Sequence, residues 1–131
     1  MAEKYLIDSD VLIDILRNYA PAIAWLKSIA KYHADIHIMS AMEIIDGSRN
    51  KIDLNHNKKF IIQFSILFPA TEEMKLAYQL LITHRLATGI GIADCMIAAT
   101  AKQRGIRLYS FNAKHFRHVE GLDMRMPYQR K

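Results

Sequence analysis

Short apolar runs alternate with longer amphipathic segments along the chain. The runs predict strands at residues 5–7, 36–39 and 107–110, and at residues 67–69, where Pro69 indicates an edge strand because proline cannot donate to a central ladder. Apolar residues spaced three and four apart predict the helices, at residues 10–17, 22–32, 40–47, 58–65, 71–86 and 92–104. Strands separated by one or two helices imply parallel crossovers. We therefore expect an α/β fold, a three-layer α/β/α sandwich with a short parallel sheet.

Local signals set several of the predicted helix ends. Ser9 is expected to cap the helix over residues 10–17. Ser40 and Glu43 have the spacing of a capping box, which predicts that the third helix begins at Ser40. Gly105 follows the last apolar helix and is expected to end it.

Length and composition limit the classes of function. A chain of 131 residues has room for one domain, which we expect to span residues 1–131. No uncharged apolar stretch approaches the roughly 18–20 residues that cross a bilayer, and Asp8 interrupts the first apolar run. We expect a soluble cytoplasmic protein with no signal peptide and no membrane partner. The single Cys95 excludes an intramolecular disulfide, suits a reducing compartment and is interpreted as a small buried hydrophobe.

Positive charge is concentrated in the last quarter of the chain. The net charge is +5, but residues 102–131 hold eight Lys and Arg against two acidic side chains, whereas residues 1–101 are close to balance. This asymmetry is typical of a protein with a polyanionic partner such as nucleic acid. The alternative is a set of scattered, solvated charges.

Acidic residues stand where the predicted strands end. Asp8 ends the first strand, Glu43 lies one turn into the helix after the second, and Asp94 lies in the first turn of the last apolar helix. The carboxyl ends of parallel strands share one sheet edge, so we expect the three carboxylates to converge. Such a cluster is tolerated only with protonation or bound cations, and hard oxygen ligands favour Mg²⁺ or Mn²⁺ over zinc.

Each of these acids also has a purely structural explanation. Asp8 could form an Asx-turn or cap the next helix. Glu43 could serve only as the second member of the capping box. Asp94 could complement the helix dipole, although its apolar surroundings make an unpaired carboxylate costly.

Other polar residues have weaker signals. Asp10 and Asp14 form a like-charge pair one helical turn apart that is expected to face solvent, although Asp10 is close enough to Asp8 to be a secondary ligand. Asp46, three residues after Glu43, could likewise belong either to the site or only to the helix. His115 and His118 are interpreted as surface residues, because their spacing lacks the further ligands of a zinc site.

Four segments together are more specific than any one residue. In chain order they read LIDSDVLID (6–14), IMSAMEIIDG (38–47), IADCMIAATA (92–101) and LYSFNAKHF (108–116). This arrangement resembles the PIN-domain family, most closely its VapC-type toxins of toxin–antitoxin pairs, over essentially the whole chain. The resemblance implies an Mg²⁺- or Mn²⁺-dependent ribonuclease with a carboxylate cluster. Asp8, Glu43 and Asp94 match the family's catalytic and metal-binding acids.

The sequence departs from the family pattern at three positions. Asp10 stands where the family often has Asn, and Asn112 where it frequently has an acid. His115 stands where a later Asp is often found. The resemblance then implies a weaker second metal site. Ser110 matches the family's Ser or Thr at the end of that strand, which implies a role in orienting a carboxylate or a water molecule.

These observations predict an endoribonuclease that cleaves RNA with a metal-activated water, as the toxin of a type II toxin–antitoxin system. Arg107, Lys114 and Arg117 are expected to bind the RNA backbone. The resemblance implies a small antitoxin as partner, and large apolar residues in segments 11–32 and 74–86 indicate a homodimer. The alternatives are a housekeeping PIN nuclease in RNA processing, a non-catalytic RNA-binding α/β domain and a receiver-like signalling domain. A receiver-like domain would need an acidic residue at the end of a middle strand, and residues 68–70 supply none.

Overall fold

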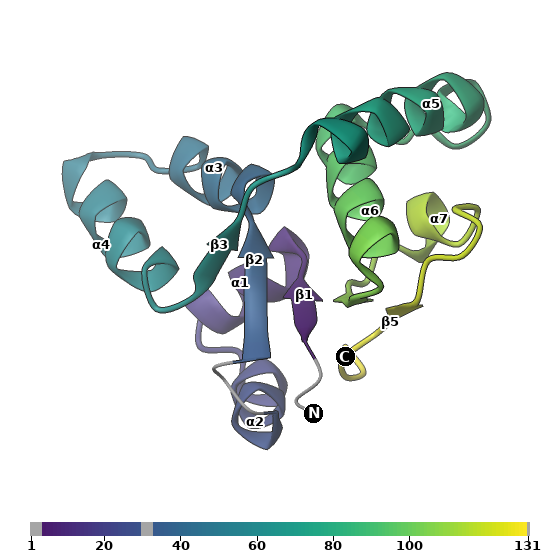
Figure 1. Ribbon diagram of the computed structural model, residues 1–131. Helices are drawn as coiled ribbons and strands as arrows, with labels where there is room; N and C mark the ends of the chain where they lie inside the picture. The colour runs from purple at the N-terminus through teal and green to yellow at the C-terminus, as the bar shows by residue number, and fades with distance from the viewer. Residues whose placement is uncertain (1–3, 30–32, 131) are drawn as a thin grey trace.

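A five-stranded parallel sheet forms the centre of the molecule. The computed structural model describes residues 4–29 and 33–130, and its strand order is β3-β2-β1-β4-β5 (Figure 1). The strands are β1 (Tyr5–Ile7), β2 (Ala34–His37), β3 (Ser65–Leu67), β4 (Arg107–Tyr109) and β5 (Met124–Arg125). The prediction of a short parallel sheet is confirmed. Strand β3 lies at one edge, but it covers residues 65–67 and not the predicted 67–69, so Pro69 lies beyond its end.

Helices cover both faces of the sheet. They are α1 (Ser9–Leu16), α2 (Ala20–Ser28), α3 (Ile38–Asp46), α4 (Lys51–Ile61), α5 (Thr71–Thr88), α6 (Ile92–Arg104) and α7 (Ala113–Phe116). Adjacent side chains on a strand point to opposite faces, so Leu6 packs in the core with α5 and α6 while Ile7 packs in the core with α1 and α3 (Figure 1). The three-layer sandwich is thus confirmed. No helix within the described ranges is long and apolar enough to span a bilayer.

The start of α3 differs from the prediction. The strand ends at His37, two residues before the predicted end, and the helix begins at Ile38. Burial lowers the pKa of His37 to about 4, so its neutral Nδ1 accepts a hydrogen bond from the Met39 amide at 3.0 Å. The predicted capping box at Ser40 is wrong, because a buried imidazole serves as the cap instead and Ser40 lies within the helix.

Other boundaries differ for similar local reasons. Asp8, not Ser9, caps α1 by accepting a hydrogen bond from the Ser9 amide at 2.9 Å. Asn50 caps α4, which therefore begins earlier than the predicted residue 58. Helix α2 ends at Ser28, and part of its predicted extension, residues 30–32, lies outside the described residues. The short elements α7 and β5 were not predicted, whereas Cys95 is buried as expected.

A buried polar network ties α3 to the α5–α6 pair. The Nε2 atom of His37 lies 3.0 Å from the Thr100 hydroxyl, which donates to Glu73 at 3.2 Å. Arg104 donates to both oxygens of the Glu73 carboxylate, at 2.7 and 3.0 Å. Since Nδ1 of His37 accepts from the Met39 amide, Nε2 carries the proton and donates to Thr100. One ring nitrogen of His37 thus holds the first turn of α3, while the other joins it to α6.

Candidate active site

Asp8 and Ser110 come from neighbouring strands and meet at the carboxyl edge of the sheet. Asp8 follows β1 and Ser110 follows β4, and the two strands are paired directly. The Ser110 hydroxyl donates to the Asp8 carboxylate at 2.7 Å. Both side chains are buried, with Asp8 4% exposed. The Asp8 carboxylate is consequently held in one orientation by the serine and by its own helix cap.

Asp10 turns back toward the same edge. Its carboxylate accepts hydrogen bonds from the Phe111 amide at 3.0 Å and from the Val11 amide at 2.7 Å. The expectation that Asp10 faces solvent is wrong, because the backbone after β4 supplies a donor at that position. Asp10 instead adds a second carboxylate beside Asp8.

Glu43 approaches the site from α3. It lies at the rim with an exposed side chain, and its Oε2 atom accepts a hydrogen bond from the Ser9 hydroxyl at 3.4 Å. Because His37 caps α3, Glu43 has no capping role in the structure. The capping-box explanation of Glu43 is therefore wrong.

Asp94 forms a separate contact group with two residues at α7. Its Oδ2 atom lies 2.8 Å from Nδ1 of His115 and 3.4 Å from Nδ2 of Asn112. The interpretation of His115 as a surface residue is therefore wrong, because its imidazole contacts Asp94. The signal in the sequence is the Asn112 to His115 spacing, because Asn112 caps α7 and turns the imidazole toward α6.

Burial and mutual repulsion dominate the electrostatics of the acids. Burial, and after it the charge of Asp10, raise the pKa of Asp8 to about 7, although hydrogen bonds from Ser110 and Ser9 act in the opposite direction; the charge of Asp94 adds a smaller rise. Burial also raises the pKa of Asp10. For Glu43, which is only partly withdrawn from solvent, this partial desolvation and then the charge of Asp94 raise the pKa. The acids are thus close enough to sense one another's charge.

The donor set suits a hard divalent cation. Among the described residues, no Lys or Arg forms an ion pair with Asp8, Glu43 or Asp94, although the imidazole of His115 lies 2.8 Å from Asp94. Carboxylate oxygens are the ligands that Mg²⁺ and Mn²⁺ prefer, and Mg²⁺ keeps several of its water ligands. No three acidic, His or Cys side chains of residues 4–29 and 33–130 already form a metal-binding group. The carboxylate chemistry thus fits a hard divalent ion, although these side chains are not arranged as a ready metal-binding group.

The three predicted RNA-binding residues lie in two different places. Lys114 and Arg117 are exposed at α7, beside His115. Arg107 begins β4, at the opposite end of that strand from Ser110, and pairs with Asp123 at 3.1 Å. Arg107 is therefore not brought to the candidate site.

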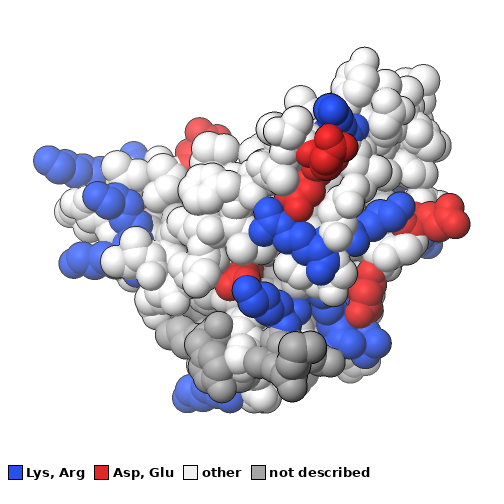
Figure 2. All heavy atoms as spheres, in the orientation of Figure 1, with Lys and Arg blue, Asp and Glu red and all other residues white. Residues whose placement is uncertain are grey.

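Much of the C-terminal positive charge is paired. On the right of the face in Figure 2, Lys and Arg side chains lie among acidic ones, whereas several basic side chains on the left have no acidic neighbour. Four of the seven basic residues that the structure describes after residue 101 form ion pairs, namely Arg104, Arg107, Arg125 and Arg130. The charge asymmetry of the sequence thus overstates the free positive surface.

The C-terminal segment returns to α1 beside the acids. The Tyr128 hydroxyl donates to Asp14 at 2.7 Å, and Arg130 donates to the same carboxylate oxygen at 3.1 Å. Arg130 also donates to the Asp10 carbonyl at 3.2 Å and stacks 3.9 Å from the centre of the Phe111 ring. Asp14 is consequently paired and does not point freely into solvent. No local pattern predicts this contact, because it joins residues more than 100 positions apart.

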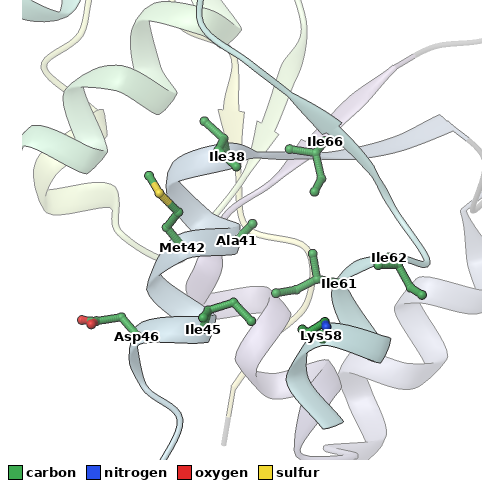
Figure 3. A pocket seen from close by; sticks show the side chains of 9 residues that line it. All are labelled: Ile38, Ala41, Met42, Ile45, Asp46, Lys58, Ile61, Ile62 and Ile66. Atoms are coloured by element: carbon green, nitrogen blue, oxygen red, sulfur yellow. The ribbon is translucent and has the colours of Figure 1, made fainter. Parts of the chain in front are cut away.

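Two hollows flank α3, and only one adjoins the acids. An apolar groove of about 380 Å³ lies between α3 and α4 (Figure 3). Asp46 stands at its margin with the carboxylate turned away from it, and Glu43 does not line it. A more polar hollow of about 520 Å³ is lined by Glu43 together with residues of α1 and α4. Asp46 is therefore separated from the carboxylate cluster.

The sequence model of the PIN domain matches residues 5–122. The chain belongs to the PIN-domain family. It is 34% identical over 120 residues to the ribonuclease VapC10 of Mycobacterium tuberculosis strain CDC 1551 / Oshkosh, a match that covers 89% of each chain. The same figures hold for VapC10 of strain ATCC 25618 / H37Rv. The resemblance to VapC-type PIN domains is therefore confirmed.

Solved structures share the PIN fold of this chain. DNA-bound VapBC from Salmonella typhimurium aligns with a TM-score of 0.80 at 22% identity, covering 95% of this chain and 98% of that one. A toxin–antitoxin complex from Klebsiella pneumoniae aligns with a TM-score of 0.77 at 21% identity, covering 96% and 99%. At this level of identity the alignments establish the fold alone.

Proposed function

We propose that this PIN domain is a divalent-metal-dependent endoribonuclease that acts in the cytoplasm as the toxin of a type II toxin–antitoxin system. The observation that carries the proposal is the placement of Asp8, Glu43 and Asp94. They come from three distant segments, the charge of Asp94 raises the pKa of both Asp8 and Glu43, and none of the three has a Lys or Arg partner among the described residues. A fold alone would not require three such acids at one place.

Each acid has a distinct role in this proposal. Asp8 and Asp94 would hold the ion, and Glu43 would complete the ligand set or accept the proton of the attacking water. Ser110 would keep Asp8 oriented through the 2.7 Å hydrogen bond. When bound, Mg²⁺ or Mn²⁺ lowers the pKa of a water ligand and offsets the charge that develops on the phosphate.

RNA binding would use the exposed side of α7. Lys114 and Arg117 are exposed there, on the same short helix as His115, which contacts Asp94. Contacts of Lys and Arg with phosphates weaken as salt is added, and single-stranded or looped RNA exposes the backbone and bases to such a site. This assignment excludes Arg107, which lies at the far end of β4.

Replacing Glu43 by Gln tests the function directly. Incubated with a small RNA, the wild type should cleave with Mg²⁺ or Mn²⁺ and not with EDTA. The Glu43→Gln variant should lose at least about tenfold in rate, because it keeps the side-chain shape but removes the charge. Its unfolding free energy should change by less than about 0.5 kcal/mol, because Glu43 makes no helix cap.

Asp46→Asn is the matched control, since Asp46 lies one turn later on α3 and outside the cluster. This variant should cleave as fast as the wild type. Equal cleavage by the wild type in EDTA, with contaminating nuclease excluded, would overturn metal dependence. RNA binding without any cleavage would favour the non-catalytic domain.

We also propose a small antitoxin as partner. The solved neighbours include toxin–antitoxin complexes, and the hollow of about 520 Å³ lined by Glu43 offers a place where a short segment could bring a basic side chain to that carboxylate. A bound antitoxin of this kind would block RNA cleavage. Co-expression with a neighbouring reading frame identifies the partner, and a harmless chain that captures none would favour a housekeeping nuclease.

A stripe on α5 supports a homodimer. Met74, Tyr78, Ile82 and Leu86 follow one another at intervals of four residues, and their exposed fractions are 44%, 63%, 59% and 99%. Residues at this spacing share one helix face, and an apolar face of this kind is commonly buried in a symmetric interface.

Light scattering should therefore report a dimer at micromolar concentration for the wild type. The double variant Tyr78→Lys/Ile82→Lys should be a monomer, because two charges cannot be buried at the centre of the stripe. Ile52→Lys is the control, since Ile52 is 83% exposed on α4, away from the stripe. A wild type that stays monomeric at high micromolar concentration contradicts the proposed dimer.

A further inference from the structure

Three polar atoms converge where α7 approaches α6. They are Oδ2 of Asp94, Nδ1 of His115 and Nδ2 of Asn112. His115 lies 2.8 Å from Asp94 and 2.9 Å from Asn112, and Asn112 lies 3.4 Å from Asp94. The side chains of His115 and Asp94 are 23% and 21% exposed, so small solutes can reach both from solvent.

The orientation of Asn112 is fixed by its helix cap. Its Oδ1 atom accepts from the backbone amide of His115 at 3.4 Å, so its amide nitrogen must face the imidazole and Asp94. That nitrogen is a donor only, and the oxygen of Asp94 is an acceptor when ionised. The remaining question is whether Nδ1 of His115 carries a proton.

Neither neutral form of the imidazole satisfies both short contacts. Without a proton, Nδ1 accepts from Asn112, but its lone pair then faces the Asp94 oxygen at 2.8 Å. With a proton, Nδ1 donates to Asp94, but two N–H groups then face each other at 2.9 Å. The group is therefore mismatched as a hydrogen-bonding cluster.

A cation between His115 and Asp94 removes the unfavourable contact of lone pairs. Neighbouring ligands of an octahedral ion at roughly 2.0–2.2 Å stand about 3 Å apart, close to the 2.8 Å between Nδ1 and Oδ2. Asn112 can then donate to Asp94 alone. Imidazole nitrogen suits first-row transition metals, whereas carboxylate and water suffice for Mg²⁺.

We propose that His115 binds the divalent ion together with Asp94, so that this site prefers Mn²⁺ over Mg²⁺ more strongly than a site of carboxylates alone. The inference rests on the proposed function, because Asp94 is a ligand there too. It goes further by assigning an imidazole ligand and a metal preference to this chain.

Metal binding without RNA tests the inference. The full chain is stripped of metals and titrated with MnCl₂ or MgCl₂ alone, with the two dissociation constants measured by calorimetry. His115→Asp should lower the ratio of Mn²⁺ to Mg²⁺ affinity by about tenfold or more, mainly through weaker Mn²⁺ binding. His118→Asn is the matched control, since His118 is exposed three residues later and should leave both constants unchanged.

A measurement on the wild type keeps the test independent of variant folding. Zn²⁺, which is diamagnetic, should shift the Nδ1 resonance of His115 in nitrogen-15 spectra and leave that of His118 in place. An unshifted His115, or an unchanged affinity ratio in a folded His115→Asp variant, overturns the imidazole ligand. If metal-dependent cleavage persists in that case, the proposed function stands. If no divalent ion binds at all, both proposals fail.

Discussion

The Asp8→Asn variant is expected to lose RNA cleavage while its metal-free form becomes more stable than the wild type. Burial raises the pKa of Asp8 to about 7 from 3.8 in the unfolded chain, so the folded state binds a proton more tightly. Stability of the metal-free wild type should therefore fall as the pH rises from about 4 to about 7. At pH 7 the variant should gain roughly 2–4 kcal/mol, because one pKa unit corresponds to about 1.4 kcal/mol.

Urea unfolding at several pH values, with EDTA present, checks this result. The Asn side chain can still cap α1 and contact Ser110, so loss of activity cannot be attributed to loss of these contacts. Mn²⁺ should stabilise the wild type and have little effect on the variant, because only the wild type keeps the full ligand set. Full cleavage by Asp8→Asn would remove Asp8 from the proposed mechanism. Full cleavage by Asp94→Asn would likewise remove Asp94 from the mechanism.

Arg104→Ala should destabilise the protein by about 3 kcal/mol, because it leaves the carboxylate of Glu73 buried and without its main partner. Glu73 is 5% exposed, and Arg104 contacts both of its oxygens. Burial alone would raise the pKa of Glu73, but hydrogen bonds from Arg104 and the Ala70 amide hold it below its ordinary value. Without Arg104 the carboxylate must be protonated or strained.

Chemical unfolding of a small series separates this effect from general surface charge. The double variant Glu73→Gln/Arg104→Ala should regain at least about 1 kcal/mol over the single variant, since no charge is then left unpaired. Lys75→Ala should cost less than about 0.5 kcal/mol, because its pair with Glu72 lies in solvent. Equal losses for Arg104→Ala and Lys75→Ala would show that the buried network adds nothing.

The sequence pattern predicted those helices and strands whose ends depend on neighbouring residues. Helix α6 begins and ends at the predicted residues, since Gly105 adopts the left-handed conformation that stops it. Strand β3 lies at a sheet edge as predicted, but it spans Ser65–Leu67 and ends two residues before the proline from which the edge was inferred. Asp8 and Asp94 could be placed at one edge because parallel crossovers leave little choice.

Features that depend on residues far apart in the chain could not be predicted from the sequence. A serine three residues before a glutamate looks like a capping box, but His37, buried against Thr100, caps α3 instead. The two-residue strand β5 carries no pattern of its own and forms only by pairing with β4. Charge counting treated Arg107 as available for RNA, although a carboxylate sixteen positions later in the chain pairs with it.

The return of the C-terminal segment to α1 affects how the protein should be prepared. Arg130 contacts the carbonyl of Asp10, and Phe111 lies beneath its guanidinium group. A purification tag fused after residue 131 would begin next to these contacts and could disturb Asp10 or hinder access to the acids. A tag placed before β1 leaves residues 126–130 as they are. Activity assays should therefore use the amino-terminal fusion, with its carboxy-terminal counterpart as a measure of how far this segment matters.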